Sequence, residues 1–233
     1  MTRILIVTAV AAERDAVVDG RQAAIGMIDG LEIHRAITGA GMIDVLAAGV
    51  GAPAAAVATG CALRNDYDLV FSAGIAGGFP AAPVGSTAVA EAVVHADLGV
   101  RTPAAFQSMA ELGWGPVRHR LDTLLVEQLS DRSGARIGEI LTVSTVTGSA
   151  ERAAELLTSH PAAVAEAMEG IGVYLAAARA ELPFAELRAI SNPVGPRDRD
   201  RWRMADALTA LTAAFDAVLA APLVLQSRGV TQS

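Results

Sequence analysis

The chain opens with Arg3-Ile4-Leu5-Ile6-Val7-Thr8, an apolar run of strand length, and continues into Ala12–Val18, which favours a helix. Short apolar runs alternate with segments of helical period along the rest of the chain, a pattern typical of an α/β fold. We therefore expect one domain over residues 1–233, with three layers (α/β/α) around a mixed, twisted sheet. The polar residues 226–233 are expected to form a frayed tail.

The same pattern locates the individual elements. Strands are predicted at Arg3–Thr8, Glu32–Thr38, Asp44–Ala48, Leu69–Ser72, Ser86–Val94, Ile140–Ser144 and Leu187–Ile190. Helices are predicted at Ala12–Val18, Pro53–Arg64, Leu121–Leu129, Ser149–Thr158, Ala162–Ala180 and Arg201–Val224, with Pro53 and Pro161 suited to a first helical turn. No strand is predicted between Gly99 and Ile140. We expect Gly99–Pro116 to be a long surface loop, whose apolar residues either pack onto the domain or form a substrate lid.

Bulk properties exclude several classes of protein. The net charge of −7 argues against a dominant nucleic-acid or anionic-membrane surface. A single cysteine, Cys61, excludes an intrachain disulfide and a multi-cysteine metal site, and we interpret it as a buried small hydrophobe. The N-terminal apolar run is too short for a signal peptide, and no uninterrupted apolar stretch has the length of a membrane span. We expect a cytoplasmic protein.

Two glycine clusters follow predicted strands. Gly49-Val50-Gly51 precedes the Pro53 helix, and Gly74-Ile75-Ala76-Gly77-Gly78 follows Leu69–Ser72. Backbone N–H groups at such turns can hold an anion, a sugar hydroxyl or the edge of a base. A dinucleotide site would need its glycines directly after the first strand, where this chain has Thr8-Ala9-Val10-Ala11-Ala12-Glu13. That argues against NAD or FAD, and the P-loop motif is absent as well.

Two glutamates occupy informative positions. Glu13 comes just after the first strand, where α/β sheets place ligand sites, although a solvated acid in a first helical turn is the simpler interpretation. Glu169 interrupts an Ala/Val/Met segment that is expected to pack against the sheet. A buried carboxylate needs a partner, either ribose hydroxyls or an arginine.

The stretch Arg188-Ala189-Ile190-Ser191-Asn192 ends the last predicted strand. An amide carries a donor and an acceptor side by side, which matches the O6 acceptor and the N7–H donor of a 6-oxopurine leaving as its N7 tautomer. A carboxylate would suit a 6-aminopurine better. The alternative is that Asn192 is only a turn former.

Other polar groups carry weaker signals. His95 and Asp97 lack a third metal ligand nearby and are interpreted as a strand-end turn. The charged run Arg197–Arg201 is either a solvated loop or a grip for a substrate carboxylate. No Ser-His-Asp order or nucleophile elbow is present.

Taken in order, the motifs resemble the nucleoside phosphorylase/nucleosidase superfamily over nearly the whole chain. They are Ile4–Glu13, Gly49–Ala55, Ser72–Gly78, Ala167-Met168-Glu169-Gly170 and Arg188–Asn192. Within the superfamily the chain is most similar to the futalosine hydrolase family, itself similar to methylthioadenosine/S-adenosylhomocysteine nucleosidase. The adenine-specific relatives carry Asp at the position of Asn192.

The resemblance implies a nucleoside phosphorylase-like fold, a small nucleoside substrate, hydrolysis of a ribosyl N-glycosidic bond, a homodimer or higher homo-oligomer, and no metal or organic cofactor. It implies catalytic roles for Glu13 as general base, Arg188 in positioning water and Asn192 in reading the base. Glu169 and Met168 would contact the ribose, Ala76 and Gly77 would line the base and ribose pocket, and Val146 and Thr147 would touch the base. Because Asn192 cannot deliver a proton to N7, the source of that proton stays open.

Three alternatives remain at this point. One is a phosphorolytic enzyme of the same superfamily, which would need an anion site that the early glycine turns do not provide with an arginine. Another is an adenine nucleosidase. The third, from a different class, is a nucleoside-binding protein without activity, for which the combination of Glu13, Glu169 and Arg188 has no evident use.

Overall fold

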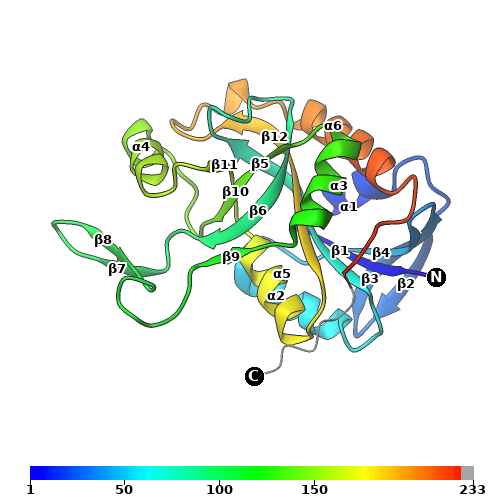
Figure 1. Cartoon of the computed structure of the whole chain (residues 1–233). Helices are drawn as coiled ribbons and strands as arrows, with labels where there is room; N and C mark the ends of the chain where they lie inside the picture. Colours follow the sequence, from blue (N-terminus) through cyan, green and yellow to red (C-terminus); the bar gives the residue numbers. More distant parts are fainter. Residues whose placement is uncertain (227–233) are drawn as a thin grey trace.

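The computed structural model describes residues 1–226, so the expected tail lies outside the described residues except for Gln226 (Figure 1). The helices are α1 (Ala11–Val18), α2 (Ala52–Ala62), α3 (Thr123–Ser133), α4 (Ala150–Ser159), α5 (Gly170–Arg179) and α6 (Met204–Val218), with a 3-10 turn at Arg199–Arg201. The strands are β1 (Arg3–Thr8), β2 (Ala24–Ile28), β3 (Leu31–Thr38), β4 (Gly41–Ala47), β5 (Leu69–Gly78), β6 (Thr87–His95), β7 (Gly99–Arg101), β8 (Phe106–Ser108), β9 (Arg118–Arg120), β10 (Arg136–Thr142), β11 (Ala163–Ala167) and β12 (Phe184–Pro193).

The central sheet is mixed, as predicted. Its strand order is β11-β10-β6-β12-β5-β1-β4-β3-β2, with β9 paired to β6. Strands β4, β1, β5 and β12 run parallel to one another, whereas β12 pairs antiparallel with β6, and β4 pairs antiparallel with β3. Because β11 pairs with β10 on one side and antiparallel with β5 on the other, these strands close into a ring with β6 and β12.

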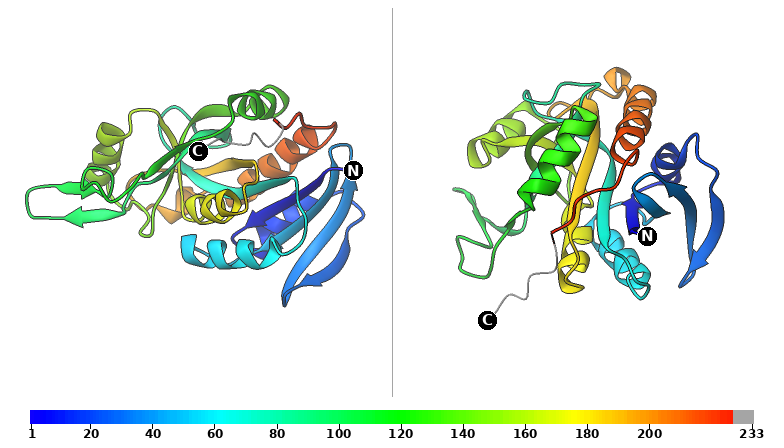
Figure 2. Two further views of the ribbon diagram at one scale, coloured as in Figure 1. Left: turned by 60° about the horizontal axis from the view of Figure 1, so that its bottom comes forward. Right: turned by 45° about the vertical axis from the view of Figure 1, so that its right-hand side comes forward.

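Two apolar clusters lie on opposite faces of the sheet. One joins α1, α3 and α6 through side chains such as Val17, Leu129 and Phe215. The other joins α2 and α5 through Ala58 and Ile171. Figure 2 shows the two groups of helices on either side of the strands, and the predicted three-layer α/β/α fold is confirmed.

The predicted helix Ala162–Ala180 is confirmed over Gly170–Arg179 and wrong in its first part. Residues Ala163–Ala167 form strand β11, all five of them buried, and α5 begins only at Gly170. Pro161 precedes the strand and starts no helix. Alanine favours a helix only weakly, and here burial between two paired strands outweighs that preference. Glu169 therefore lies at the junction of β11 and α5 instead of inside a helix.

The glycine cluster at Gly74–Gly78 belongs to a strand and not to a turn. Strand β5 continues to Gly78 because β12 and β11 pair with it there. Its glycines permit close packing: a Cβ on Gly78 would collide with the Ala82 carbonyl and the Ile190 side chain. The predicted strand Leu69–Ser72 is thus shorter than β5, which continues through the glycine cluster to Gly78.

The segment after Gly99 also differs from the prediction, since β7, β8 and β9 lie between Gly99 and Ile140. Strands β7 and β8 form a hairpin that projects from the body on the side opposite to β2 (Figures 1 and 2). Trp114 is 68% exposed, so the interpretation that the apolar residues of Gly99–Pro116 all pack onto the domain is wrong. Its possible role as a lid stays a prediction.

The structure also differs from the prediction at β2, α6 and Cys61. Strand β2 is absent from the prediction, and the helix expected over Arg201–Val224 is the shorter α6. Cys61 is partly exposed instead of fully buried. Among residues 1–226, no helix is both long and apolar enough to cross a membrane.

Candidate active site

Arg188 is the centre of a buried charged cluster. Its side chain on β12 is fully buried, and each guanidinium nitrogen donates a hydrogen bond to a different neighbour. Nε donates to Glu186 Oε1 at 2.9 Å, Nη1 to Glu169 Oε2 at 3.3 Å and Nη2 to Ser72 Oγ at 2.7 Å. These partners come from β12, the β11–α5 junction and β5, so the arginine joins three elements at one point.

Glu13 lies beside this cluster and is 3% exposed, which contradicts the interpretation as a solvated acid. It belongs to the first turn of α1, and both carboxylate oxygens accept backbone hydrogen bonds. Oε2 accepts from Ala9 at 2.9 Å and from Val10 at 3.2 Å, while Oε1 accepts from Ile75 at 2.9 Å. The carboxylate is therefore fixed between the end of β1 and the end of β5.

Gly74 allows Glu13 and Arg188 to approach each other. A Cβ at this residue would come within 2.5 Å of Glu13 Oε1 and 2.9 Å of Arg188 Nη1, and its φ of +152° also favours glycine. The carboxylate and the guanidinium thus converge over one residue of β5. Any larger side chain would separate them.

Glu169 connects the cluster to the other glycine turn. Its Oε1 accepts a hydrogen bond from the backbone N–H of Gly51 at 3.1 Å, directly before α2. The positive end of a helix dipole stabilises a carboxylate in this position. The sequence predicts that backbone N–H groups of this glycine turn bind an anion or a sugar hydroxyl. In the structure the Gly51 N–H instead donates to the carboxylate of Glu169.

The cluster contains more acid than base. Glu13, Glu169 and Glu186 surround a single guanidinium. Burial raises the pKa of Glu13, against the lowering effect of the Ile75 hydrogen bond and of Arg188. Burial also raises the pKa of Glu186. For Arg188, burial opposes the charge, but Glu186, Glu169 and Glu13 outweigh it and raise its pKa. The arginine stays charged while the acids compete for it.

A separate cavity contains Asn192. Its lining includes Gly77, Val146, Thr147, Glu166 and Asn192, and the cavity continues to Pro196, Arg197 and Trp202. Asn192 Oδ1 accepts a hydrogen bond from Ser191 Oγ at 2.8 Å, and Nδ2 donates to the Pro193 carbonyl at 3.0 Å. These two bonds orient the amide, and each end keeps capacity for one more partner.

Strand β5 links the cavity to the charged cluster. Arg188 lies opposite Gly74, and Asn192 lies opposite Gly77. The two glycines are three residues apart, about 10 Å along a strand. A bulge between Ile190 and Asn192 sets this register on β12. Glu13 and Arg188 do not line the cavity of Asn192; they lie one short strand segment from it.

The remaining predicted contact residues are distributed around these two centres. Gly77, Val146 and Thr147 line the cavity, with Val146 partly exposed at 46%. Ala76 is buried, and its carbonyl accepts a hydrogen bond from Ser191 Oγ. Met168 lies in the turn next to Glu169 and is partly exposed. Each of them therefore adjoins the cluster or the cavity.

The weaker candidates take different positions. His95 Nε2 lies 3.6 Å from Asp97 Oδ1, and no group of three or more potential metal ligands occurs in the part of the chain that the structure describes. Arg197 lines the cavity and its guanidinium lies over the Trp202 ring at 5.9 Å. Arg199 is exposed.

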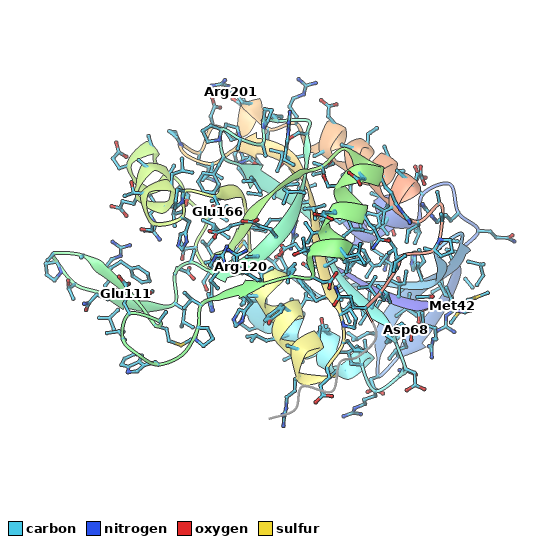
Figure 3. The ribbon with its side chains drawn as sticks, in the orientation of Figure 1. Met42, Asp68, Glu111, Arg120, Glu166 and Arg201 are labelled. Atoms are coloured by element: carbon cyan, nitrogen blue, oxygen red, sulfur yellow. The ribbon has the colours of Figure 1, made fainter. Side chains whose placement is uncertain are left out.

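Sequence reasoning gave no role to Ser72, Glu186 and Glu166. Glu166 on β11 is 6% exposed, and its carboxylate accepts hydrogen bonds from Thr147 N at 2.8 Å and Thr147 Oγ1 at 2.5 Å. In Figure 3 it lies below α4, whereas Glu111 lies just after the projecting hairpin, where its carboxylate accepts a hydrogen bond from Ser108 N. The sequence does point to Glu166, because it is the one acid in the apolar run 163–168. A helix predicted over this run gives no reason to place that acid at the site.

Comparison with known proteins places the chain in a family. The model of the phosphorylase superfamily matches residues 3–220. A futalosine hydrolase of Streptomyces coelicolor is 50% identical over 96% of this chain and 97% of its own length, and one of Acidothermus cellulolyticus is 45% identical over 93% and 90%. The crystal structure of the 5'-methylthioadenosine/S-adenosylhomocysteine nucleosidase of Neisseria meningitidis with methylthio-immucillin-A has a TM-score of 0.81 at 20% identity, covering 94% of this chain and 99% of that one, which shows the shared fold. The chain belongs to the phosphorylase superfamily and, within it, to the futalosine hydrolase family.

Proposed function

We propose that this protein hydrolyses the N-glycosidic bond of futalosine and releases hypoxanthine, as a step of menaquinone biosynthesis. The observation that carries the proposal is the pairing of two centres on β5. One is the cluster of Glu13, Arg188 and Glu169 at Gly74, and the other is the Asn192 cavity at Gly77. The separation of about 10 Å suits a nucleoside, with its sugar at the cluster and its base in the cavity.

In this mechanism Glu13 is the general base that takes a proton from the attacking water. Its fixed carboxylate and the pKa raised by burial both favour that role. Arg188 orients the water together with Glu13. Glu169 accepts hydrogen bonds from the ribose hydroxyls while Met168 packs against the sugar. Cleavage passes through an oxocarbenium-like transition state next to these carboxylates, which stabilise its positive charge.

Asn192 reads the base. As the glycosidic bond breaks, N9 keeps the bonding electron pair and N7 takes up a proton from solvent water. Asn192 Nδ2 donates to O6 of hypoxanthine and its Oδ1 accepts from the new N7–H, using the capacity that Ser191 and Pro193 leave free. Gly77, Val146 and Thr147 form the surrounding walls, with the backbone near Ala76 between base and ribose. A site built for these polar edges rejects the wrong base because buried groups are left unpaired.

The direct test incubates the purified protein with futalosine, with and without inorganic phosphate, and measures the products by chromatography. We expect free hypoxanthine at a rate that phosphate does not change. Formation of a ribosyl phosphate would identify a phosphorylase instead, and binding of futalosine without turnover would identify a nucleoside-binding protein. Either outcome would contradict the proposal.

The base preference has its own test. Asn192→Asp replaces the donor end of the amide with a carboxylate oxygen, which is an acceptor. Two acceptors, this oxygen and O6, then face each other, whereas a 6-amino group could donate to the carboxylate. We expect the ratio of kcat/KM for futalosine to that for its 6-amino counterpart to fall by on the order of 10-fold or more. If the ratio is unchanged while both rates are measurable, Asn192 does not read the base.

We also propose that the protein works in the cytoplasm as a homodimer or higher homo-oligomer without a cofactor. Helices α2 and α5 pack against each other, and they expose Val57 and Leu175 to 68% and 50%. Apolar side chains of this kind are available for a subunit contact. Light scattering of the purified protein measures the mass, and a monomer would contradict this part of the proposal.

A further inference from the structure

We propose that Glu166 is a second specificity-determining residue, which accepts a hydrogen bond from N1–H of a 6-oxopurine while Asn192 binds the O6/N7 edge. This inference deepens the proposed function and rests on it. It assigns a binding role to a buried carboxylate that the hydrolytic mechanism above does not use.

The sheet register brings Glu166 and Asn192 to the same place. Glu166 on β11 lies opposite Gly77 from one side, and Asn192 on β12 lies opposite Gly77 from the other. Residues that face each other across neighbouring strands point to the same face of the sheet. The backbones of β11 and β12 are two strand spacings apart, about 10 Å. Both side chains also line the same cavity as Gly77, and a Cβ on Gly77 would lie 3.4 Å from Asn192 Nδ2 and 3.0 Å from Val194 Cγ2.

The carboxylate of Glu166 is prepared to accept. Thr147 holds it with two donors, one to each oxygen, and this fixes its orientation while leaving lone pairs on both oxygens. The Asn192 amide, which lines the same cavity, has both a donor and an acceptor end. The ionised carboxylate of Glu166 can only accept hydrogen bonds. Burial raises its pKa, against the lowering effect of the Thr147 bonds, which means that the carboxylate gains from a further donor.

The two classes of purine differ in the hydrogen-bonding character of N1. A 6-oxopurine carries a proton on N1 beside its O6 acceptor, whereas N1 of a 6-aminopurine is an acceptor. A carboxylate attracts the first and repels the second. With Asn192 at O6 and N7, the neighbouring N1 position is the next polar group along the edge, and an acceptor is required there. Two residues then discriminate the base, one at each side of Gly77.

The test measures binding of free bases by calorimetry, using hypoxanthine, 1-methylhypoxanthine and adenine. Methylation removes the N1–H donor. For the unaltered protein we expect hypoxanthine to bind more tightly than 1-methylhypoxanthine by on the order of 10- to 100-fold, the value of a hydrogen bond to a charged group. Equal affinities would overturn the inference, and this measurement needs no variant.

Glu166→Gln separates the hydrogen bond from steric exclusion of the methyl group. The amide can donate to N1 of adenine, so we expect the preference for hypoxanthine over both other bases to shrink. Glu139→Gln is the matched control, because Glu139 is buried to the same 6% on the neighbouring strand β10 but does not line the cavity. It should retain the preference. A uniform loss of affinity for all three bases in Glu166→Gln would mean that Glu166 only holds the Thr147 loop, and would overturn the inference.

Turnover distinguishes this failure from failure of the proposed function. If the unaltered protein releases hypoxanthine from futalosine but shows no N1–H dependence, the function stands and the role of Glu166 falls. If it discriminates the free bases but leaves futalosine intact, the base-reading pair stands and the proposed reaction falls. With both correct, Glu166→Gln raises KM for futalosine more than it lowers kcat.

Discussion

Glu13 shows how a single residue combines burial with precise placement. Three backbone N–H groups converge on its two oxygens, and a glycine at residue 74 leaves Arg188 room beside it. The hydrogen bonds favour the ionised form, and desolvation disfavours it more strongly, so the pKa rises. A carboxylate in this environment is fixed in position and is a stronger base than an exposed glutamate.

Glu13→Gln should lower kcat by on the order of 100- to 10,000-fold with little change in substrate affinity, because the amide cannot take a proton from water. Asp15→Asn, an exposed change on the same helix, is the control and should keep its activity. The comparison uses steady-state kinetics and calorimetric binding of futalosine. A variant with full kcat would remove Glu13 from the mechanism.

The pH dependence follows from the same residue. A general base must be ionised, and the pKa of Glu13 is raised above its ordinary value of 4.5. Activity is therefore lost as the pH falls through that raised pKa. We expect the acidic limb of the kcat/KM profile of the free enzyme to lie above pH 4.5. An acidic limb at or below that value would show that Glu13 is not the titrating base.

At the scale of elements, sequence periodicity located most strands and helices but missed those governed by tertiary pairing. Arg188 and Asn192 were placed at a strand end because the apolar run before them is clear. The Ala-rich segment of β11 has the composition of a helix, and it forms a strand because the strands paired with it bury all five of its residues. Glu166 was missed for that reason. The sequence does contain a pattern for β2, because the dipeptide Asp29-Gly30 favours a two-residue hairpin turn. In the structure these residues have positive φ angles of 47° and 81° and connect β2 to β3.

The contact between α2 and α5 shows how element packing supports the site. A Cβ on Gly172 of α5 would collide with the backbone carbonyl of Ala52 at the start of α2. This close approach keeps the Gly51 N–H, just before α2, within hydrogen-bond distance of Glu169, just before α5. Helix packing and the geometry of the Glu169 carboxylate therefore depend on the same residue.

Gly172→Ala should lower both the melting temperature and the activity, because the helices must separate to admit the methyl group. The matched control is Gly60→Ala within α2, where a Cβ would meet nothing within 4 Å. That change should be neutral or stabilising by up to about 1 kcal/mol, the difference in helix propensity between glycine and alanine. Thermal unfolding and futalosine turnover measure both effects. Equal behaviour of the two variants would show that the contact at Gly172 is not tight.

For the whole molecule, the charged cluster imposes a cost on stability that depends on pH. Glu186 is fully buried, its Oε2 has no hydrogen-bond partner among residues 1–226, and it shares Arg188 with two other acids. Its carboxyl also lies against Gly170 at the start of α5, where a Cβ would overlap it. The cluster thus keeps Arg188 in place at the expense of holding an excess of negative charge in the interior.

The sign of this effect can be tested with Glu186→Gln. The pKa of Glu186 is raised above 4.5 in the folded protein, so the folded state holds the proton more tightly than the unfolded chain does. As the pH rises from 4.5 through the raised pKa, ionisation of Glu186 lowers the stability of the unaltered protein, and the glutamine variant lacks this contribution. The free energy of unfolding of the variant relative to the unaltered protein should therefore increase with pH across that window and then level off. Chemical denaturation from pH 4.5 upward measures it, with the exposed Glu127→Gln on α3 as the control for a change of charge alone. A relative stability that decreases with pH would mean that Arg188 favours ionised Glu186 more than burial opposes it.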